Sequence, residues 1–320
     1  MPSLLSVATT AGKKEKNGPL GEYFDCDLEN RADSSWEEEE RFMLETSVNT
    51  ALLKANVSER ELDYILMGDL LNQIVSSSYT ARSFAAPFIG LYGACSTMSL
   101  SLSVAALLID GGFAEKTVSA TCSHFCTAER QYRYPLEMGV QRTASSQWTA
   151  TGAGAAVLSS HKIGLPSVTR ITTGRVTDYQ ITDVNNMGAA MAPAAVNTMK
   201  THFNETGRAP DYYDLITTGD LGMYGKELVL RMLSEEFPSL EGNYVDCGCE
   251  LYGSDKSVKA GGSGCGCSAL YLGKIFSELS AGKLKKVLFI STGALHNPIL
   301  LNQKESIPSI AHAVAIETVD

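Results

Sequence analysis

An internal duplication constrains the fold of this chain more than any other feature. The eight residues Asp63–Leu70 recur 151 residues later as Asp214–Leu221, with five of the eight positions identical. Three more pairs match at one offset of 170 residues: Cys95 with Cys265, Gly112 with Gly282, and Lys116 with Lys286. The second half therefore carries a longer insertion, near residues 221–260. A repeat of this length predicts one structural unit used twice.

Each half has the pattern of a βαβ unit. An amphipathic helix precedes a short apolar strand ending in Gly-Asp, and a glycine-rich turn, a second helix and a β-branched strand (117–121 or 287–291) follow. Such alternation predicts sheets covered by helices through right-handed crossovers. The polar stretch 159–166, interrupted by a proline, predicts the boundary between an N-terminal half at 1–160 and a C-terminal half at 161–320.

Composition excludes several classes of partner. The 36 acidic and 26 basic side chains give a formal net charge of −10, which repels phosphate backbones, so we expect no nucleic acid partner. No apolar run reaches the roughly 20 residues that cross a bilayer, and the N-terminus lacks the pattern of a secretory signal. We expect a chain made in the cytoplasm without signal peptide or transmembrane segment, which would reach a membrane only through partner proteins.

Eight cysteines are spread along a chain long enough to be stabilised by burial, so we interpret them as thiols. The pairs Cys247/Cys249 and Cys265/Cys267 have a single intervening residue, a poor spacing for zinc. We expect no metal site in the protein.

The segment Trp36–Lys54 has the pattern of a helix. Four glutamates, Glu37–Glu40, lie in its first turn, where negative charge suits the helix dipole. We interpret this charge run as a solvated helix face.

Cys95 marks a predicted corner between a strand and a helix. The apolar run before it passes through Gly93 and Ala94, and the helix after it ends at Gly111–Gly112. A thiol at a helix N-terminus has its thiolate favoured, as a nucleophile requires. The alternative is a buried cysteine packed under a tight turn, and the local sequence leaves both open.

This corner inside a duplicated chain is similar to the nucleophile corner of thiolases and β-ketoacyl synthases. Five strings, covering 68–73, 128–135, 191–195, 260–265 and 303–308, together resemble the stage V sporulation protein AD (SpoVAD) family over nearly the whole chain. The family usually begins about a strand earlier. The resemblance implies an α/β fold in which two thiolase-like βαβ halves form a five-layered αβαβα architecture, and it implies a homodimer.

The residues of thiolase-type chemistry are missing from the matching positions. That chemistry needs a base for the cysteine and donors for an oxyanion. Gly262-Ser263-Gly264 stands where active relatives have Gly-His-Pro, and Gly219-Asp220 stands where synthases have another catalytic histidine. The stretch Ser291–His296 offers no second cysteine where thiolases have one. We predict a pseudoenzyme without catalytic residues; the alternative is an acyltransferase of the thiolase or ketoacyl-synthase type that uses Cys95.

Five histidines remain to be placed. His124, after the strand 118–121, either lines the same pocket as Cys95 or is a neutral ring bonded to backbone, and the two alternatives stay balanced. His296 lies in the matching loop of the second half and is the weaker candidate. We assign packing or surface positions to the other three: His161, His202 and His312.

In the SpoVAD family the pocket is taken to bind dipicolinic acid, free or as its calcium chelate, during loading of the developing spore. The resemblance implies the same function here, together with membrane SpoVA proteins and a peripheral location at the spore inner membrane. It implies no cofactor beyond calcium within the ligand chelate. A purely structural role, in which the chain docks to membrane subunits with a vestigial pocket, is the third hypothesis.

A flat aromatic dianion needs a slot and amide donors, which the helix starts after Cys95 and Cys265 and nearby glycines offer. Asp69 and Asp220 either suit a calcium-bound ligand or cap strand ends through backbone bonds. Candidates for pairing with a carboxylate are Arg82, Arg130 and Arg133, although Arg130 could also pair with Glu129. The predicted ligand-binding residues are Asp69, Asn72, Cys95, His124, Asp220, Ser263, Gly264 and Cys265.

Overall fold

The computed structural model describes residues 1–28, 34–133 and 135–318. Its N-terminal half contains five sheet strands in the order β4-β3-β5-β7-β1. These strands are β1 (Ser3–Ala11), β3 (Tyr64–Gly68), β4 (Phe88–Gly90), β5 (Lys116–Ser123) and β7 (Gly152–Ser159). The short strand β2 (Cys26–Asp27) pairs with β1. β1, β3, β5 and β7 are almost entirely buried, whereas β4 lies at the sheet edge and has no buried residue.

The C-terminal half repeats the arrangement as β10-β9-β12-β13-β8. The bounds are β8 (Pro166–Thr172), β9 (Leu215–Thr218), β10 (Tyr244–Asp246), β12 (Lys286–Ala294) and β13 (Ser309–Thr318). In both halves the first two strand pairings in this order are parallel and the last two are antiparallel. A single pair, Ser3 with Ser167, joins β1 to β8. The duplication seen in the sequence is thus a duplication of strand order.

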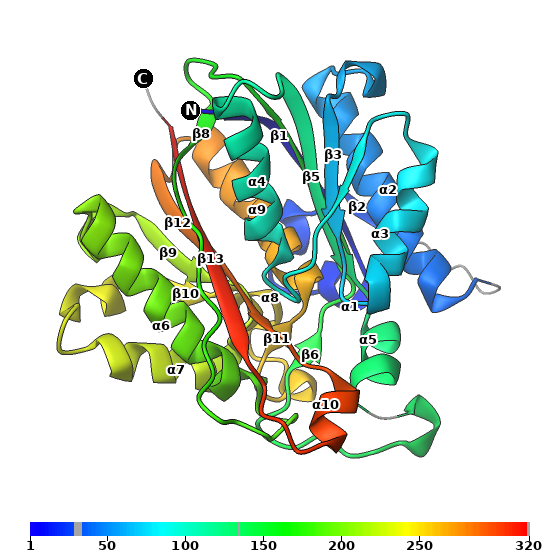
Figure 1. Ribbon diagram of the computed structural model, residues 1–320, viewed down its shortest axis with the longest axis vertical. Coiled ribbons are helices and arrows are strands. Elements are labelled where there is room, and N and C mark those ends of the chain that lie inside the picture. The colour runs from blue at the N-terminus through cyan, green and yellow to red at the C-terminus, as the bar shows by residue number, and fades with distance from the viewer. Residues whose placement is uncertain (29–33, 134, 319–320) are drawn as a thin grey trace.

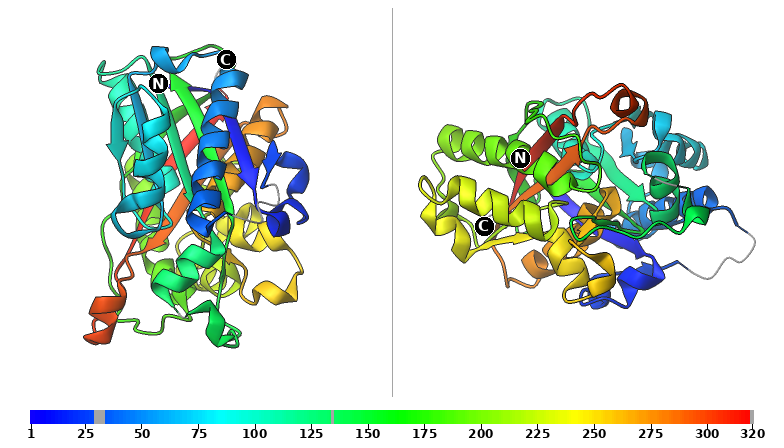
Figure 2. Two further views of the ribbon diagram at one scale, coloured as in Figure 1. Left: turned by 90° about the vertical axis from the view of Figure 1, so that its right-hand side faces the viewer. Right: turned by 90° about the horizontal axis from the view of Figure 1, so that it is seen from below.

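Helices complete the layers on the outer faces and between the half-sheets, as Figures 1 and 2 show. Two cover the outer face of the N-terminal half, α2 (Trp36–Ala55) and α3 (Val75–Thr80). Two cover the outer face of the other half, α6 (Met187–Thr206) and α7 (Gly222–Leu233). Between the half-sheets lie α4 (Thr97–Asp110) and α9 (Cys265–Ser280). The predicted five-layered αβαβα architecture is confirmed.

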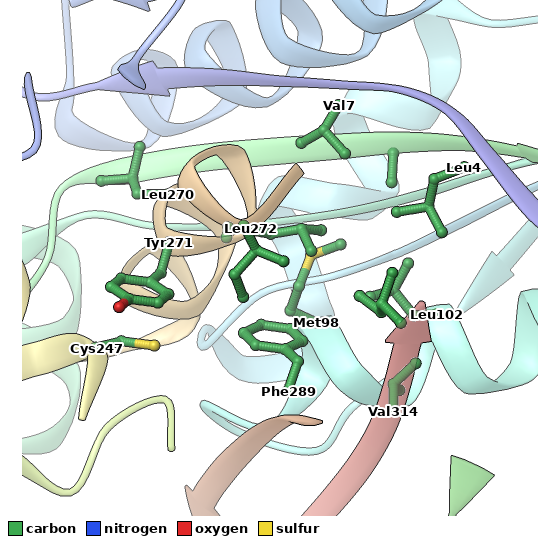
Figure 3. Close-up of a cluster of buried hydrophobic side chains, with 14 of the residues drawn as sticks. Leu4, Val7, Met98, Leu102, Cys247, Leu270, Tyr271, Leu272, Phe289 and Val314 are labelled. Atoms are coloured by element: carbon green, nitrogen blue, oxygen red, sulfur yellow. The ribbon is translucent and has the colours of Figure 1, made fainter. Parts of the chain in front are cut away.

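The central helices are held by a continuous apolar core. Met98 and Leu102 of α4 and Leu272 of α9 pack in one cluster with Leu4 of β1 and Phe289 of β12, all fully buried (Figure 3). Burying such a side chain contributes roughly 1.5–3 kcal/mol. This core fixes the relative position of the two helix N-termini, where Cys95 and Cys265 lie.

Equivalent residues of the repeat make equivalent hydrogen bonds. The Asp63 carboxylate accepts the backbone N–H groups of Glu115 and Lys116 at 2.6 and 3.1 Å. In the second half, Asp214 accepts those of Lys285 and Lys286 at 2.7 and 2.9 Å. Each aspartate therefore ties the start of one parallel strand to the start of its neighbour.

The predicted helix at 36–54 is confirmed and is one residue longer. A capping box starts it: the Ser35 hydroxyl accepts the Glu38 N–H, and the Glu38 carboxylate accepts the Ser35 N–H at 2.7 Å. The solvated-face interpretation is wrong for Glu40, which is fully buried and accepts a hydrogen bond from Thr127 of α5 (Phe125–Tyr132) at 3.0 Å. Packing of α5 on this face excludes water, which the helix pattern alone does not reveal.

The remaining elements gather at the end of the molecule opposite both termini (Figure 1). They are α1 (Lys13–Lys16), α8 (Cys247–Tyr252), α10 (Pro298–Asn302) and a two-stranded parallel sheet of β6 (Trp148–Thr149) and β11 (Gly262–Ser263). Within the described residues, no helix is both long enough and apolar enough to span a bilayer.

Candidate functional site

Cys95 lies at a tight corner before α4. The preceding residue, Ala94, has φ of 50°, a left-handed conformation that costs energy for a residue other than glycine. Two hydroxyls hold the corner: Ser96 donates to the Gly93 carbonyl and Thr97 to the Ala94 carbonyl, both at 2.6 Å. These two hydrogen bonds thus hold Ala94 in its strained backbone conformation.

A cavity of about 50 Å³, called here the inner cavity, lies beside Cys95. Its lining comes from both halves of the repeat and consists of Leu70, Tyr92, Ala94, Cys95, Ala128, Glu129, Tyr132, Arg133, Thr149, Met187, Met191, Ser263, Ala294 and His296. Most of these side chains are apolar or aromatic, and Arg133 and Glu129 are the charged ones. Such a cavity suits a ligand with apolar faces and a few polar atoms.

An outer cleft of about 420 Å³ adjoins the inner cavity. The two share Tyr92, Tyr132 and His296. The Tyr92 and Tyr132 hydroxyl oxygens are 3.2 Å apart, and the rings of Tyr132 and His296 have centroids 5.3 Å apart. These three aromatic side chains form the boundary between cleft and cavity.

The environment of Cys95 favours the neutral thiol. Burial raises the pKa of this thiol, and the nearby Asp220 carboxylate raises it further. The backbone N–H of Gly264 and the Arg133 guanidinium act in the opposite direction and do not reverse the shift. Cys95 is half-buried and lines the inner cavity, and its raised pKa does not favour the thiolate that a nucleophile requires.

The second helix start has the same design. Gly264 precedes α9 with φ of 94°, and a Cβ there would lie 2.8 Å from Ser123 Oγ and from Thr149 Cγ2. Cys265 is fully buried, and its thiol donates a hydrogen bond to the Ala94 carbonyl at 3.1 Å. Cys265 thus braces the corner that carries Cys95 and does not line the cavity.

The structure brings only part of the predicted set to the cavities. Cys95 and Ser263 line the inner cavity, and Asn72 lines the outer cleft. Asp69 is fully buried, and its carboxylate accepts the N–H groups of Leu71 and Ser77 at 2.9 and 2.7 Å. These are the strand-end capping bonds of the second interpretation.

Asp220 is also fully buried and lies outside both linings. Its Oδ2 atom accepts a hydrogen bond from the Ser268 hydroxyl at 3.3 Å, whereas Oδ1 has no hydrogen-bond partner among the described residues. Burial and the neighbouring Asp246 carboxylate hold the pKa of Asp220 well above its usual range. Asp220 is therefore a buried neighbour of Cys95 that lines neither cavity.

The two equivalent histidines have different roles. His124 caps α5, where its Nδ1 accepts the Cys126 N–H at 3.2 Å and its Nε2 lies 3.1 Å from the Glu39 carboxylate. His296 lines the inner cavity, with a buried Nε2 that has no hydrogen-bond partner in the described part of the chain. Burial, and then the Arg133 charge, lower the pKa of His296 to about 4. The sequence contains one signal for His296 as a cavity residue, namely that its loop matches the His124 loop across the repeat.

One of the three candidate arginines reaches the cavity. Arg133 lines it and pairs with Glu129 at 2.5 Å. Arg130 pairs instead with Glu37 of α2, so the suggested Glu129–Arg130 brace is wrong. Arg82 donates to the Tyr79 carbonyl at 3.0 Å and lies over the Tyr79 ring. Tyr134, part of the string 128–135, lies outside the described residues.

Sequence reasoning missed the aromatic boundary of Tyr92 and Tyr132 and the methionines Met187 and Met191. Tyr132 lies within the string 128–135, and Met191 begins the string 191–195. Among the described residues no group of three or more histidine, cysteine, aspartate or glutamate side chains is arranged to hold a metal ion.

The doubled half-sheets, the two central helices and the cysteine corner define a protein of the thiolase-like fold class. Solved structures agree: 3-oxoacyl-[acyl-carrier-protein] synthase III of Aquifex aeolicus VF5 has a TM-score of 0.63 at 12% identity, covering 99% of this chain and 100% of its own. Acat5 thiolase from Ascaris suum, in complex with coenzyme A, has a TM-score of 0.63 at 10% identity with the same coverage. Such identities show a shared fold alone.

The chain belongs to the Stage V sporulation protein AD (SpoVAD) family, whose model matches residues 1–317. It is 47% identical over 315 residues to Stage V sporulation protein AD of Bacillus subtilis (strain 168), which covers 98% of this chain and 93% of the relative. The resemblance noted in the sequence is confirmed over almost the full length.

Proposed function

We propose that this sporulation protein binds dipicolinic acid in the cavity beside Cys95, acts together with membrane SpoVA proteins in spore loading, and catalyses no reaction on its ligand. The observation that carries the proposal is the Arg133 guanidinium, with its ion-pair partner Glu129, at the wall of a cavity whose other side chains are mostly apolar or aromatic. A planar guanidinium pairs with a carboxylate through two parallel hydrogen bonds. Arg133 is well placed for this because its side chain is only 9% exposed.

The two cavities suggest how a flat diacid would lie. The inner cavity has room for a few water-sized groups, so one carboxylate fits there and the ring does not. The larger outer cleft, bordered by Tyr92, Tyr132 and His296, takes the ring between aromatic side chains. Neutral His296, with its unpartnered Nε2, supplies a polar contact at the boundary.

Calcium would find few protein ligands in this arrangement. Asp69 and Asp220 line neither cavity, and Glu129 is the one carboxylate that the described residues contribute to the inner lining. Glu129 is already paired with Arg133. The geometry therefore favours the free acid over its calcium chelate.

Calorimetric titration tests the proposal. Dipicolinate, with and without calcium, is expected to release or absorb heat with the native chain, and Arg133→Gln is expected to weaken the affinity at least tenfold. Arg231→Gln is the matched control, because Arg231 is an exposed arginine on α7. Absence of heat with both forms of the ligand at millimolar concentration refutes the proposal.

An acyltransferase is the second candidate, favoured by one observation: His296 lines the same cavity as Cys95. Two facts weigh against it, the raised pKa of the thiol and the lowered pKa of the histidine. Incubation with acyl-CoA followed by intact mass measurement decides between the functions. An adduct that disappears in Cys95→Ser supports transfer; no adduct across several chain lengths supports binding alone.

The proposal includes a homodimer held peripherally at the spore inner membrane by SpoVA partners. Light scattering that gives the mass of one chain contradicts the dimer. Cavity variants could abolish dipicolinate binding and still leave spore loading unchanged. That result would support a docking role alone.

A further inference from the structure

Two arginines converge on one carboxylate behind the inner cavity. Arg133 Nη1 and Arg142 Nη1 lie 2.5 and 3.3 Å from the same Glu129 oxygen. Both guanidinium groups also donate to the carbonyl of Gln147. Glu129 is the one ion-pair partner recorded for either arginine in the described residues, so this group carries one positive charge in excess.

Arg142 is held against an aromatic stack. The rings of Phe125 and Trp148 lie parallel, with centroids 3.8 Å apart. The guanidinium carbon of Arg142 lies 5.6 Å from the first ring centroid and 5.3 Å from the second. This contact holds the guanidinium beside an aromatic surface.

Two donors at this position lack acceptors. Arg142 Nε and Trp148 Nε1 are buried, and neither has a hydrogen-bond partner within the described residues. A buried donor without a partner costs roughly 1–3 kcal/mol, and more when it is charged. An anion with two or more oxygens is the kind of group that satisfies such donors.

A separate cavity of about 110 Å³ is lined by Arg142 and not by Trp148, and we call it the arginine cavity. Phe125 gives it an aromatic wall, and Gln141, Ser146 and Asn185 add neutral polar groups. Glu129 and Arg133 line both this cavity and the inner cavity. The pair of residues is therefore a wall with one cavity on each side.

We propose that the arginine cavity is a second binding site, for the carboxylate of a small planar aromatic acid. The carboxylate meets the fork of Arg142, and the ring lies against Phe125, which lines the cavity and stacks on Trp148 behind it. The site is distinct from the pocket beside Cys95, so it goes beyond the proposed function and does not depend on it. An acid bound there neutralises the excess charge that Glu129 leaves.

Trp148 makes the site directly observable. The chain has two tryptophans, so Trp36→Phe leaves Trp148 as the single tryptophan, which is excited selectively at about 295 nm. Titration of this variant with pyridine-2-carboxylate is expected to change Trp148 emission saturably in the millimolar range. Adding Arg142→Gln should weaken the response at least tenfold, Arg142→Lys should weaken it less, and the exposed Arg231→Gln should leave it intact.

The outcomes separate this site from the Cys95 pocket. Ala294 lines the inner cavity and not the arginine cavity, so Ala294→Leu is expected to fill the first and preserve the Trp148 response. A response that persists in Arg142→Gln, or that sodium chloride reproduces at equal ionic strength, overturns the proposal. If the Trp148 response is present but calorimetry detects no binding to the inner cavity, the proposed function is refuted and the arginine cavity proposal stands. Circular dichroism of each variant verifies that it is folded.

Discussion

Cys265 donates its thiol hydrogen to the carbonyl of Ala94, the residue immediately before Cys95, at 3.1 Å. The two cysteines occupy equivalent positions in the repeat, one before α4 and the other at the start of α9. Cys265 is a packing residue that supports the corner, and Cys95 faces the inner cavity. The duplicated fold has thus used one thiol to position the other.

Cys95 is expected to react slowly with alkylating agents. Burial raises the pKa of its thiol, so the reactive thiolate is scarce at neutral pH. Intact mass and peptide mapping after iodoacetamide at pH 7 and pH 8 should show Cys95 unmodified in the native chain and modified after denaturation. Saturating alkylation of native Cys95 below pH 7 would contradict the buried-thiol interpretation.

Acidification is expected to destabilise the protein through buried histidines. Burial lowers the pKa of His202, His296 and His312 to about 4 each. The unfolded chain, with a pKa near 6.5, binds more protons between these values, so the free energy of unfolding rises from pH 4 to 6.5 and falls on acidification. Each histidine contributes at most about 3 kcal/mol across this window.

Urea unfolding at several pH values between 4.5 and 7.5 measures this effect. His202→Gln, which replaces a fully buried ring, should show a shallower dependence of stability on pH than the native chain. Equal slopes for the native chain and His202→Gln would contradict the prediction.

Glu40 is expected to have the opposite pH dependence. Burial, and then the Asp69 charge, raise its pKa to about 8. The folded chain keeps a proton that the unfolded chain loses above pH 4.5, so this group's contribution to stability declines as the pH rises towards 8. Glu40→Gln should therefore stabilise the protein by about 1–3 kcal/mol at pH 8.5 and little at pH 5.

Thermal unfolding at pH 5 and pH 8.5 provides the measurement. Glu37→Gln on the same helix is the control, because Glu37 forms a partly exposed ion pair with Arg130 and its loss should cost under about 1 kcal/mol. A Glu40→Gln variant that is less stable than the native chain at both pH values would show that the carboxylate itself is required.

Gly264→Ala is expected to destabilise the start of α9. The alanine would have to adopt φ of 94°, and its Cβ would lie 2.8 Å from Ser123 Oγ and from Thr149 Cγ2. Together these effects cost about 1–3 kcal/mol of stability. Because the Gly264 N–H also interacts with Cys95, dipicolinate affinity should fall too. Gly242→Ala, where a Cβ meets open space, should leave unfolding and binding unchanged. Equal stability of the two variants would refute the argument.

The tertiary structure also decided which charges are buried. The glutamate run of α2 is typical of a solvated face, yet Glu40 is buried because α5, almost 90 residues later in the chain, packs across it. Arg130 and Arg133 are three residues apart, and only the second turns to the cavity. Helix pattern gives the spacing of such side chains, while their surroundings depend on segments distant in the sequence.

The sequence by itself determined the duplicated topology and the corner at Cys95, because repeated apolar patterns and glycine turns act locally. It did not determine which histidine reaches the cavity. His124 and His296 follow equivalent strands, but Glu39 from α2 lies beside the first ring, and no carboxylate among the described residues pairs with the second. Their roles differ because the partners come from elsewhere in the fold, and only the assembled layers bring those partners into contact.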